Sequence, residues 1–367
     1  MDTTPVIVAA RRTPIGSAGH ALRELTLIDL AAPVIVAVLS DLDLAGERVD
    51  DVVLGVARGP GGNPARVAAL DAGLPVSVPG VSVDRQCGSG LAAITLASDM
   101  VRSGSATVIL AGGAESGSRA EPGRAAFAPE WIGDPGMGEA ADALAEHLGI
   151  TRARQDAYAR RSHERALASR DHVAAELVDI GVLAQDQRPR ELSAQSLARM
   201  PAAFTPGGTV TAGNACGVSD GAAIVAIVPE WWRAERGIPG LTVRSHSTVG
   251  VSPLLPGLGP EPAIRRVIAD AQLSVSDIDV LEITEAFASV LLATTDSLGL
   301  DALGSDAERI CPLGGAIALG HPWGASGAIL MVRLFTELVR MRRGTRGVAA
   351  CAVGGGMGIA TLVERVG

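Results

Sequence analysis

The chain has 367 residues, of which 47 % are hydrophobic but only 2 % aromatic, so small aliphatic side chains fill its interior, as α/β folds require. The formal net charge of −9, without a basic stripe, argues against nucleic acid as the main partner. The apolar runs fall short of the ~20 residues of a membrane span, and the N-terminus lacks a signal-peptide pattern, so a soluble, cytoplasmic protein without membrane contact is expected.

Strand-like and helix-like stretches alternate through the first third of the chain. We predict strands at residues 6–9, 52–56, 81–84 and 106–110, helices at 25–39, 64–72 and 88–102, and a glycine-rich turn at 111–114. This alternation is typical of βαβ units in an α/β fold.

The last third of the chain repeats the scheme. We predict strands at 241–245, 280–283 and 348–353, helices at 261–271, 287–298 and 324–341, and a turn at 354–356. Residues 49–54 and 275–280 are also similar in sequence. The repetition predicts two related halves, 1–115 (completed by 218–240) and 241–367.

The middle segment, residues 116–217, differs from both halves and is predicted to be an inserted loop domain. A helix at 151–167 with Thr151 as its N-cap is expected. The segment carries arginines at positions 152, 154, 160, 161, 165, 170, 188 and 190. A solvated helix face is the ordinary role of such arginines, and a binding face for a phosphate-rich cofactor is the alternative.

Cys87 is the first candidate for chemistry. It follows the strand predicted at 81–84 and precedes the glycines of the 88–102 helix. On the first turn of a helix, free N–H groups and the helix dipole favour the thiolate and can hold the oxyanion of a thioester. A buried structural cysteine is the alternative. The four cysteines are widely spaced without a CxxC pair, so we expect reduced thiols and no metal site.

His321 is the second candidate. It stands among glycines just before the helix predicted at 324–341. There it can serve as the general base for the Cys87 thiol. A hydrogen-bonded core histidine is the alternative.

Six segments in order resemble those of the thiolase family, and the resemblance spans nearly the whole chain. They are residues 83–91, 112–116, 209–214 with 220–223, 285–288, 314–327 and 354–358. The resemblance implies a five-layered α/β fold of two similar halves with an inserted loop domain that binds coenzyme A. It implies ping-pong acyl transfer from acyl-CoA, with Cys87 as nucleophile and His321 as base and no covalently bound cofactor.

Further site residues follow from the resemblance. It implies that Gly354 with the Cys87 N–H forms one oxyanion hole, and Thr284 with His321 the other. It implies coenzyme A contacts at Met137, Arg188, Arg190, Ser196, Cys216 and Phe287. The stretch from Arg119 to Gly136 is shorter than in tetrameric thiolases, so a homodimer is expected.

The chain departs from the family pattern at the second catalytic cysteine. Ala352 occupies that position, and Cys351 lies one residue earlier, where strand alternation turns its side chain to the opposite face. A β-bulge would re-aim Cys351 and make it a candidate acid/base. The departure leaves two alternatives open. One is a thiolase-derived acyltransferase or decarboxylative condensing enzyme; the other is a non-catalytic, thiolase-like CoA-binding subunit.

Overall fold

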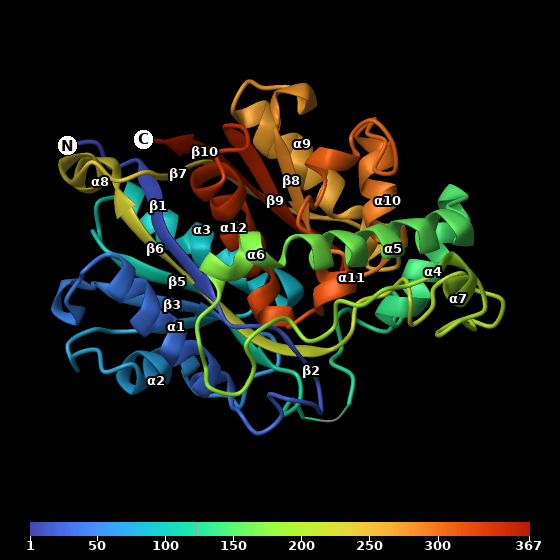
Figure 1. Cartoon of the computed structure of the whole chain (residues 1–367), viewed down its shortest axis with the longest axis horizontal. Helices are drawn as coiled ribbons and strands as arrows, with labels where there is room; N and C mark the ends of the chain where they lie inside the picture. The colour runs from blue at the N-terminus through green and yellow to red at the C-terminus, as the bar shows by residue number, and fades with distance from the viewer. Residues whose placement is uncertain (122) are drawn as a thin grey trace.

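The computed structural model describes residues 1–121 and 123–367. Within them, ten strands form one continuous sheet in the order β4-β3-β5-β6-β1-β7-β10-β9-β8, with β2 beside β6 (Figure 1). The strands are β1 Pro5–Arg12, β2 Gly16–Ser17, β3 Asp51–Gly55, β4 Val81–Val83, β5 Ile109–Ser116, β6 Ser219–Pro229, β7 Gly240–Gly250, β8 Val280–Ile283, β9 Arg346–Val353 and β10 Met357–Val366.

The two halves of this sheet and the helices between and outside them form the predicted five layers. The helices are α1 Leu27–Asp41, α2 Pro64–Asp71, α3 Ser89–Arg102, α4 Met137–Leu148, α5 Arg152–Ala168, α6 Arg170–Val173, α7 Ala194–Ala198, α8 Glu230–Arg236, α9 Pro260–Asp270, α10 Ala288–Ser297, α11 Ala316–Leu319 and α12 Trp323–Phe335. Helices α3 and α12 contact each other between the two half-sheets, whereas α1 and α2 cover the outer face of one half and α9 and α10 that of the other (Figure 1). The predicted fold class is confirmed.

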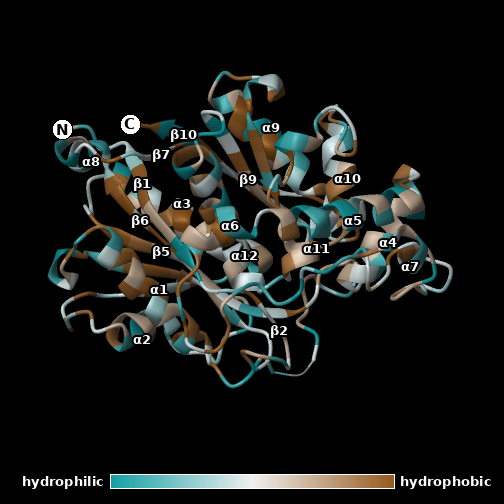
Figure 2. Cartoon of the chain, in the orientation of Figure 1, coloured by the Kyte–Doolittle hydropathy of each residue, from teal (hydrophilic) through white to brown (hydrophobic). Residues whose placement is uncertain are grey.

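Strand alternation assigns the buried residues to these layers. In β3, Val53 faces the central helices, while Val52 and Leu54 face α1 and α2. Figure 2 shows hydrophobic residues concentrated along the strands. Within the described residues, the two half-sheets join through two residue pairs between β1 and β7, which include Ile7 with Leu241.

The predicted strand at 106–110 with a turn at 111–114 is wrong, because β5 continues through these residues to Ser116. The glycines there allow close packing and do not mark a turn. A Cβ at Gly112 would collide with the carbonyl of Ala223 in β6, and one at Gly113 with the carbonyl of Gly324 in α12. The predicted 324–341 helix is also divided, since α12 ends at Phe335 and a π-helical segment, Thr336–Arg340, follows.

Substitution Gly113→Ala is therefore expected to lower the free energy of unfolding by about 3 kcal/mol, because the new methyl group overpacks the contact between β5 and α12. Chemical denaturation measures the change. Gly250→Ala is the control, since nothing lies within 4 Å of a Cβ at that position. Equal stability of the two variants would contradict this account of the packing.

The loop segment between β5 and β6 contains helices α4 to α7, and Thr151 caps α5 as predicted, accepting a hydrogen bond from the Arg154 N–H. The arginines of α5 do more than line a solvated face. Arg154 forms an ion pair with Asp296 (2.8 Å), Arg165 pairs with Glu308 (2.6 Å), and Arg161 donates to backbone carbonyls after α10. Figure 2 shows α5 as a largely hydrophilic helix. These three arginines thus connect α5 to the C-terminal half through ion pairs and hydrogen bonds.

None of the helices in residues 1–121 and 123–367 is both long and apolar enough to cross a membrane.

Candidate active site

Cys87 lies in a short 3₁₀ turn, η2 (Gln86–Gly88), one turn before α3 and not on its first turn as predicted. Gln86 has a φ of +46°, a conformation that is strained for a non-glycine residue. Hydrogen bonds hold the turn on both sides: the Gln86 N–H donates to Asp84 Oδ1 (2.7 Å), and the Ser89 hydroxyl donates to the Gln86 carbonyl (2.6 Å). The backbone therefore presents the thiol in a fixed direction.

This turn packs directly on the hairpin formed by β9 and β10. A Cβ at Gly88 would lie 2.8 Å from Val353 Cγ2 and 2.9 Å from Ile359 Cγ2. The hairpin then reverses through Gly355 and Gly356, which adopt φ values of +85° and +78°. The predicted 354–356 turn is thus confirmed, and Gly354, its first residue, adjoins the nucleophile turn.

His321 precedes α12 as Cys87 precedes α3, and the N-terminal ends of these two helices cross in close contact. A Cβ at Gly90 would lie 2.7 Å from the Gly324 carbonyl oxygen, and one at Gly327 would lie 2.6 Å from the Leu91 nitrogen. The glycines of both motifs are therefore the residues that let the helices approach. The crossing brings the two predicted catalytic residues to the same end of the central layer.

Hydrogen bonds fix the tautomer of His321. Its Nδ1 lies 2.6 Å from Ser326 Oγ, whose own proton is donated to the Pro322 carbonyl (3.3 Å). Nδ1 must therefore carry the proton and donate to Ser326, which leaves Nε2 as an acceptor. Nε2 is buried and has no hydrogen-bond partner in the part of the chain that the structure describes. Burial lowers the pKa of His321 to about 4, so the imidazole is neutral at pH 7.

The pKa of Cys87 is raised, mainly by burial and then by the neighbouring thiols of Cys216 and Cys351 and the carboxyl of Glu115. This raised pKa runs against the expectation that the helix N-terminus favours the thiolate, because desolvation disfavours the charged form of the thiol. Cys87 is thus a neutral thiol at pH 7, and the unpartnered Nε2 of His321 is a free acceptor among the described residues.

We therefore expect the rate of Cys87 alkylation by iodoacetamide to rise about tenfold per pH unit from pH 7 to beyond pH 9, since only the thiolate reacts and its pKa is raised. Peptide mass spectrometry at each pH identifies the labelled thiol. A plateau in the rate below pH 8 would mean that Cys87 is already a thiolate there, contrary to this account.

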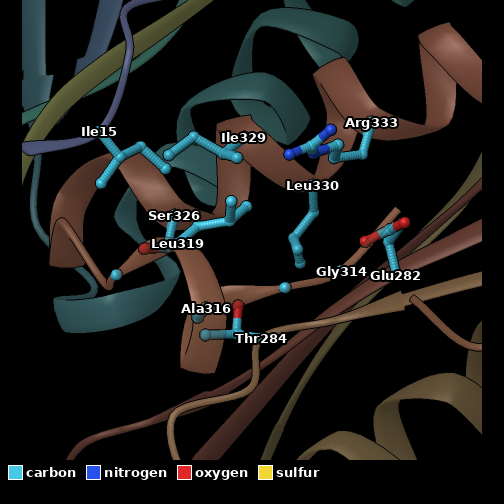
Figure 3. Close-up of a pocket in the computed structure, with 12 residues that line it drawn as sticks. Ile15, Glu282, Thr284, Gly314, Ala316, Leu319, Ser326, Ile329, Leu330 and Arg333 are labelled. Carbon is cyan, nitrogen blue, oxygen red and sulfur yellow. The ribbon is translucent and has the colours of Figure 1, made fainter. Parts of the chain in front are cut away.

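A small cavity lies beside Ser326, the hydrogen-bond partner of His321 (Figure 3). Its volume of about 20 Å³ suits one water molecule. Thr284, Glu282 and Arg333 also line it, and neither Glu282 oxygen has a hydrogen-bond partner among the described residues. Burial raises the pKa of Glu282 well above its ordinary value, although the nearby Arg333 acts in the opposite direction.

The structure separates Cys351 from the position of the missing second cysteine. Cys351 packs among the central helices, whereas Ala352 faces the cluster on the loop-domain side. The β9–β10 register runs through Cys351 and Ala352 without a shift, so no bulge re-aims the thiol. Cys351 Sγ instead lies 3.1 Å from Thr284 Oγ1, and burial raises its pKa to about 12.

Three predicted coenzyme A contacts gather at one cluster beside the loop domain. Met137, Cys216 and Phe287 all pack against it. Phe204 joins them, because its ring lies at 5.9 Å from that of Phe287 in an edge-to-face arrangement and also covers Gly138. Sequence reasoning missed Phe204, whose only signal is that aromatic residues are rare in this chain.

The three predicted phosphate contacts are more dispersed. The Arg188 guanidinium fills the space beside Gly217, next to Cys216, and its Nε has no partner in the described ranges. Arg190 is exposed, and its backbone N–H donates to Nδ1 of His163 (3.3 Å). Ser196 lies at the start of α7, where its hydroxyl donates to the Ser193 carbonyl (2.8 Å). No cluster of three or more potential metal ligands occurs in residues 1–121 and 123–367.

Comparison with known protein families matches both halves of the chain. Residues 5–130 and 128–231 match the thiolase N-terminal domain, and residues 238–365 match the thiolase C-terminal domain.

Similar proteins match along nearly their whole length. A putative acetyl-CoA C-acetyltransferase of Bacillus subtilis is 41 % identical, with 98 % of each chain covered. A 3-oxoadipyl-CoA/3-oxo-5,6-dehydrosuberyl-CoA thiolase of Escherichia coli is 40 % identical, covering 97 % of this chain and 98 % of its own. The crystal structure of the Bacillus anthracis acetyl-CoA acetyltransferase superposes with a TM-score of 0.93 at 35 % identity, covering 100 % of this chain and 99 % of that one.

Proposed function

The chain belongs to the thiolase family, and we propose that it is an acyl-CoA C-acyltransferase that works through an acyl-enzyme on Cys87. One observation carries the site assignment. The two helices headed by Cys87 and His321 cross at glycines, and His321 Nε2 is buried and unpartnered among the described residues.

The first half-reaction follows from these groups. His321 Nε2 takes the Cys87 proton, and the sulfur attacks the thioester carbonyl carbon of acyl-CoA. The oxyanion accepts hydrogen bonds from the Cys87 and Gly354 N–H groups. The tetrahedral intermediate then expels the CoA thiolate, which takes the proton from the imidazolium. Thr284 and His321 form the second oxyanion hole, to which His321 can donate only while Nε2 holds the proton taken from Cys87.

The second half-reaction passes the acyl group to an acceptor, either the thiol of coenzyme A or the α-carbon of a second acyl-CoA. The relatives are named acetyltransferases and thiolases. Those names support C-acyl transfer over the decarboxylative or non-catalytic alternatives, although Ala352 supplies no second thiol.

We also propose where coenzyme A lies. Met137, Cys216 and Phe287, with Phe204, hold the pantetheine arm. The first three belong to or pack against the hydrophobic core that α4 and α5 share with the C-terminal half, and the Phe204 ring contacts that of Phe287. Arg188, Arg190 and Ser196 are proposed for the polar end of the cofactor, and the unpartnered Arg188 Nε is the feature that supports this placement.

Thiolysis tests this proposal. The purified protein with acetoacetyl-CoA and free coenzyme A is expected to produce acetyl-CoA with turnover of roughly 1–10³ s⁻¹, the usual range for enzymes. Malonyl-CoA is the matched substrate for decarboxylative condensation. Turnover of malonyl-CoA alone would contradict the proposal in favour of the decarboxylative alternative.

A cytoplasmic location is proposed as well, supported by the four free thiols. A role in acyl-CoA and lipid metabolism is proposed from the acyl-CoA substrates in the names of the relatives.

A homodimer is proposed, because β4 is an edge strand with an apolar surround. Val76, Val81 and Leu96 are 84 %, 37 % and 39 % exposed, and an unpaired edge strand is a template for a second copy. Light scattering is expected to give the mass of two chains. Val81→Lys should shift the mass towards one chain, since a charge blocks edge pairing. A tetramer mass, or a wild-type monomer, would contradict the proposal.

A further inference from the structure

One aromatic side chain beside Gly354 has no role in the chemistry described above. Phe127 belongs to the segment between β5 and α4, and its ring lies on the turn between β9 and β10. A Cβ on Gly354 would lie 3.2 Å from the Cδ1 and Cε1 atoms of the Phe127 ring. A Cβ on Gly355 would lie 2.7 Å from the Phe127 carbonyl oxygen. Phe127 therefore covers the turn that supplies the proposed oxyanion-hole N–H.

The same turn adjoins Cys87. Gly88 contacts Val353, the residue immediately before Gly354. The nucleophile turn and the Phe127 ring thus pack against successive residues of one hairpin. In the proposed acyl-enzyme, whose carbonyl oxygen accepts from the Gly354 N–H, the Phe127 ring that covers Gly354 would border the acyl group.

Polar contacts hold the ring in this place. The Phe127 N–H donates to Asp134 Oδ2 (3.2 Å), and Asp134 forms an ion pair with Arg124 (2.7 Å). The Arg124 guanidinium also donates to the Pro135 carbonyl (2.8 Å) and lies 5.9 Å from the centre of the Phe127 ring. The segment from residue 124 to 135 is therefore closed by its own hydrogen bonds, which fix the backbone from which the Phe127 ring extends.

Leu254 borders the same region from the C-terminal half. A Cβ at Gly133 would lie 2.7 Å from Leu254 Cδ2, and the Val251 N–H donates to the Gly356 carbonyl (2.7 Å). The loop segment and the residues that follow β7 thus meet over the hairpin turn. Phe127 and Leu254 supply apolar surface there.

We propose that Phe127 forms the wall of the acyl pocket and restricts the acyl group on Cys87 to short, unbranched chains. The inference rests on the proposed function, since it needs acylation of Cys87. Each additional methylene must displace the ring or leave the pocket, and in a shaped apolar pocket one methylene changes the rate by roughly 10–200-fold.

The test is the rate at which Cys87 is acylated by acyl-CoAs of two to ten carbons, followed by intact-protein mass. This readout needs only the first half-reaction, so it does not depend on the acceptor. For the wild type, we expect acetyl-CoA to react at least about tenfold faster than octanoyl-CoA. For Phe127→Ala, octanoyl-CoA should react about tenfold faster than with the wild type, while the acetyl-CoA rate changes much less.

Trp131→Ala is the matched control, because Trp131 is an aromatic residue of the same segment but is 84 % exposed. Its chain-length profile should equal that of the wild type. Phe127→Leu, which keeps an apolar side chain, should give an intermediate profile if Phe127→Ala fails to fold.

Two results would overturn the inference: equal rates for acetyl-CoA and decanoyl-CoA in the wild type, or an unchanged profile in both Phe127 variants. Acylation by none of the acyl-CoAs would instead reject the proposed function itself, so the two failures are distinguishable.

Discussion

Replacement of Cys87 by alanine is expected to lower the turnover of acetoacetyl-CoA thiolysis by roughly 10⁴-fold or more, because removal of a nucleophile abolishes the covalent route and leaves only binding effects. The fold should survive, since the turn is held by backbone and side-chain hydrogen bonds of Asp84, Gln86 and Ser89 that do not involve the thiol. Steady-state kinetics with circular dichroism on the same preparation checks both statements.

Cys351→Ala is the control for this prediction. Cys351 is fully buried on the opposite face of β9 from Ala352 and contacts Thr284. Its removal should cost stability, as most core substitutions do, and should lower turnover less than Cys87→Ala does, because its thiol neighbours Cys87 and contacts Thr284 but does not carry the acyl group. A loss as large as that of Cys87→Ala would show that Cys351 takes part in the chemistry, against the register seen in the structure.

Replacement of His321 by glutamine is expected to lower turnover by roughly 10²–10⁴-fold, the usual contribution of a general base. The reason is specific to this site. The pKa of Cys87 is raised by burial, so the thiol cannot ionise at pH 7 without a base, and the neutral imidazole offers Nε2 for that purpose. The KM for the acyl-CoA should change little, because Nε2 acts on the proton.

Turnover can be compared between a variant that lacks the imidazole of His321 and one that lacks only the group that orients it. Ser326→Ala removes the acceptor of the Nδ1–H and should lower turnover by about tenfold, less than His321→Gln, since the base remains but its tautomer is no longer fixed. The measured order of wild type, Ser326→Ala and His321→Gln tests the assignment. Full activity in His321→Gln would contradict the role of His321 as base.

The fold was predictable wherever a residue's role depends on local pattern. The βαβ alternation predicts the strands and helices of both halves, and β8 matches its predicted range of 280–283. Strand alternation likewise predicts that Cys351 and Ala352 face opposite sides, and the two core clusters confirm it.

What escaped prediction depends on contacts between distant segments. Gly112 and Gly113 look like a turn in sequence, but they are strand residues because α12 and β6 approach the backbone there. Phe127 and Phe204 lie in irregular segments without a motif, so nothing in the local sequence indicates that they meet Gly354 and Phe287.

Charged residues show the same limit. The spacing of the α5 arginines is compatible with solvent or with phosphate, and only the tertiary structure pairs Arg154 with Asp296 and Arg165 with Glu308. The reactivity of Cys87 was also misjudged from sequence, because a helix N-terminus was visible in the motif while the burial of the thiol was not.

The most direct test of the central claim is the intact mass of the protein after incubation with acetyl-CoA, for the wild type and for Cys87→Ala side by side. The account predicts a gain of one acetyl group in the wild type and none in the variant, because Cys87 is the residue that carries the acyl group. An unshifted wild-type mass, or the same shift in Cys87→Ala, would contradict it.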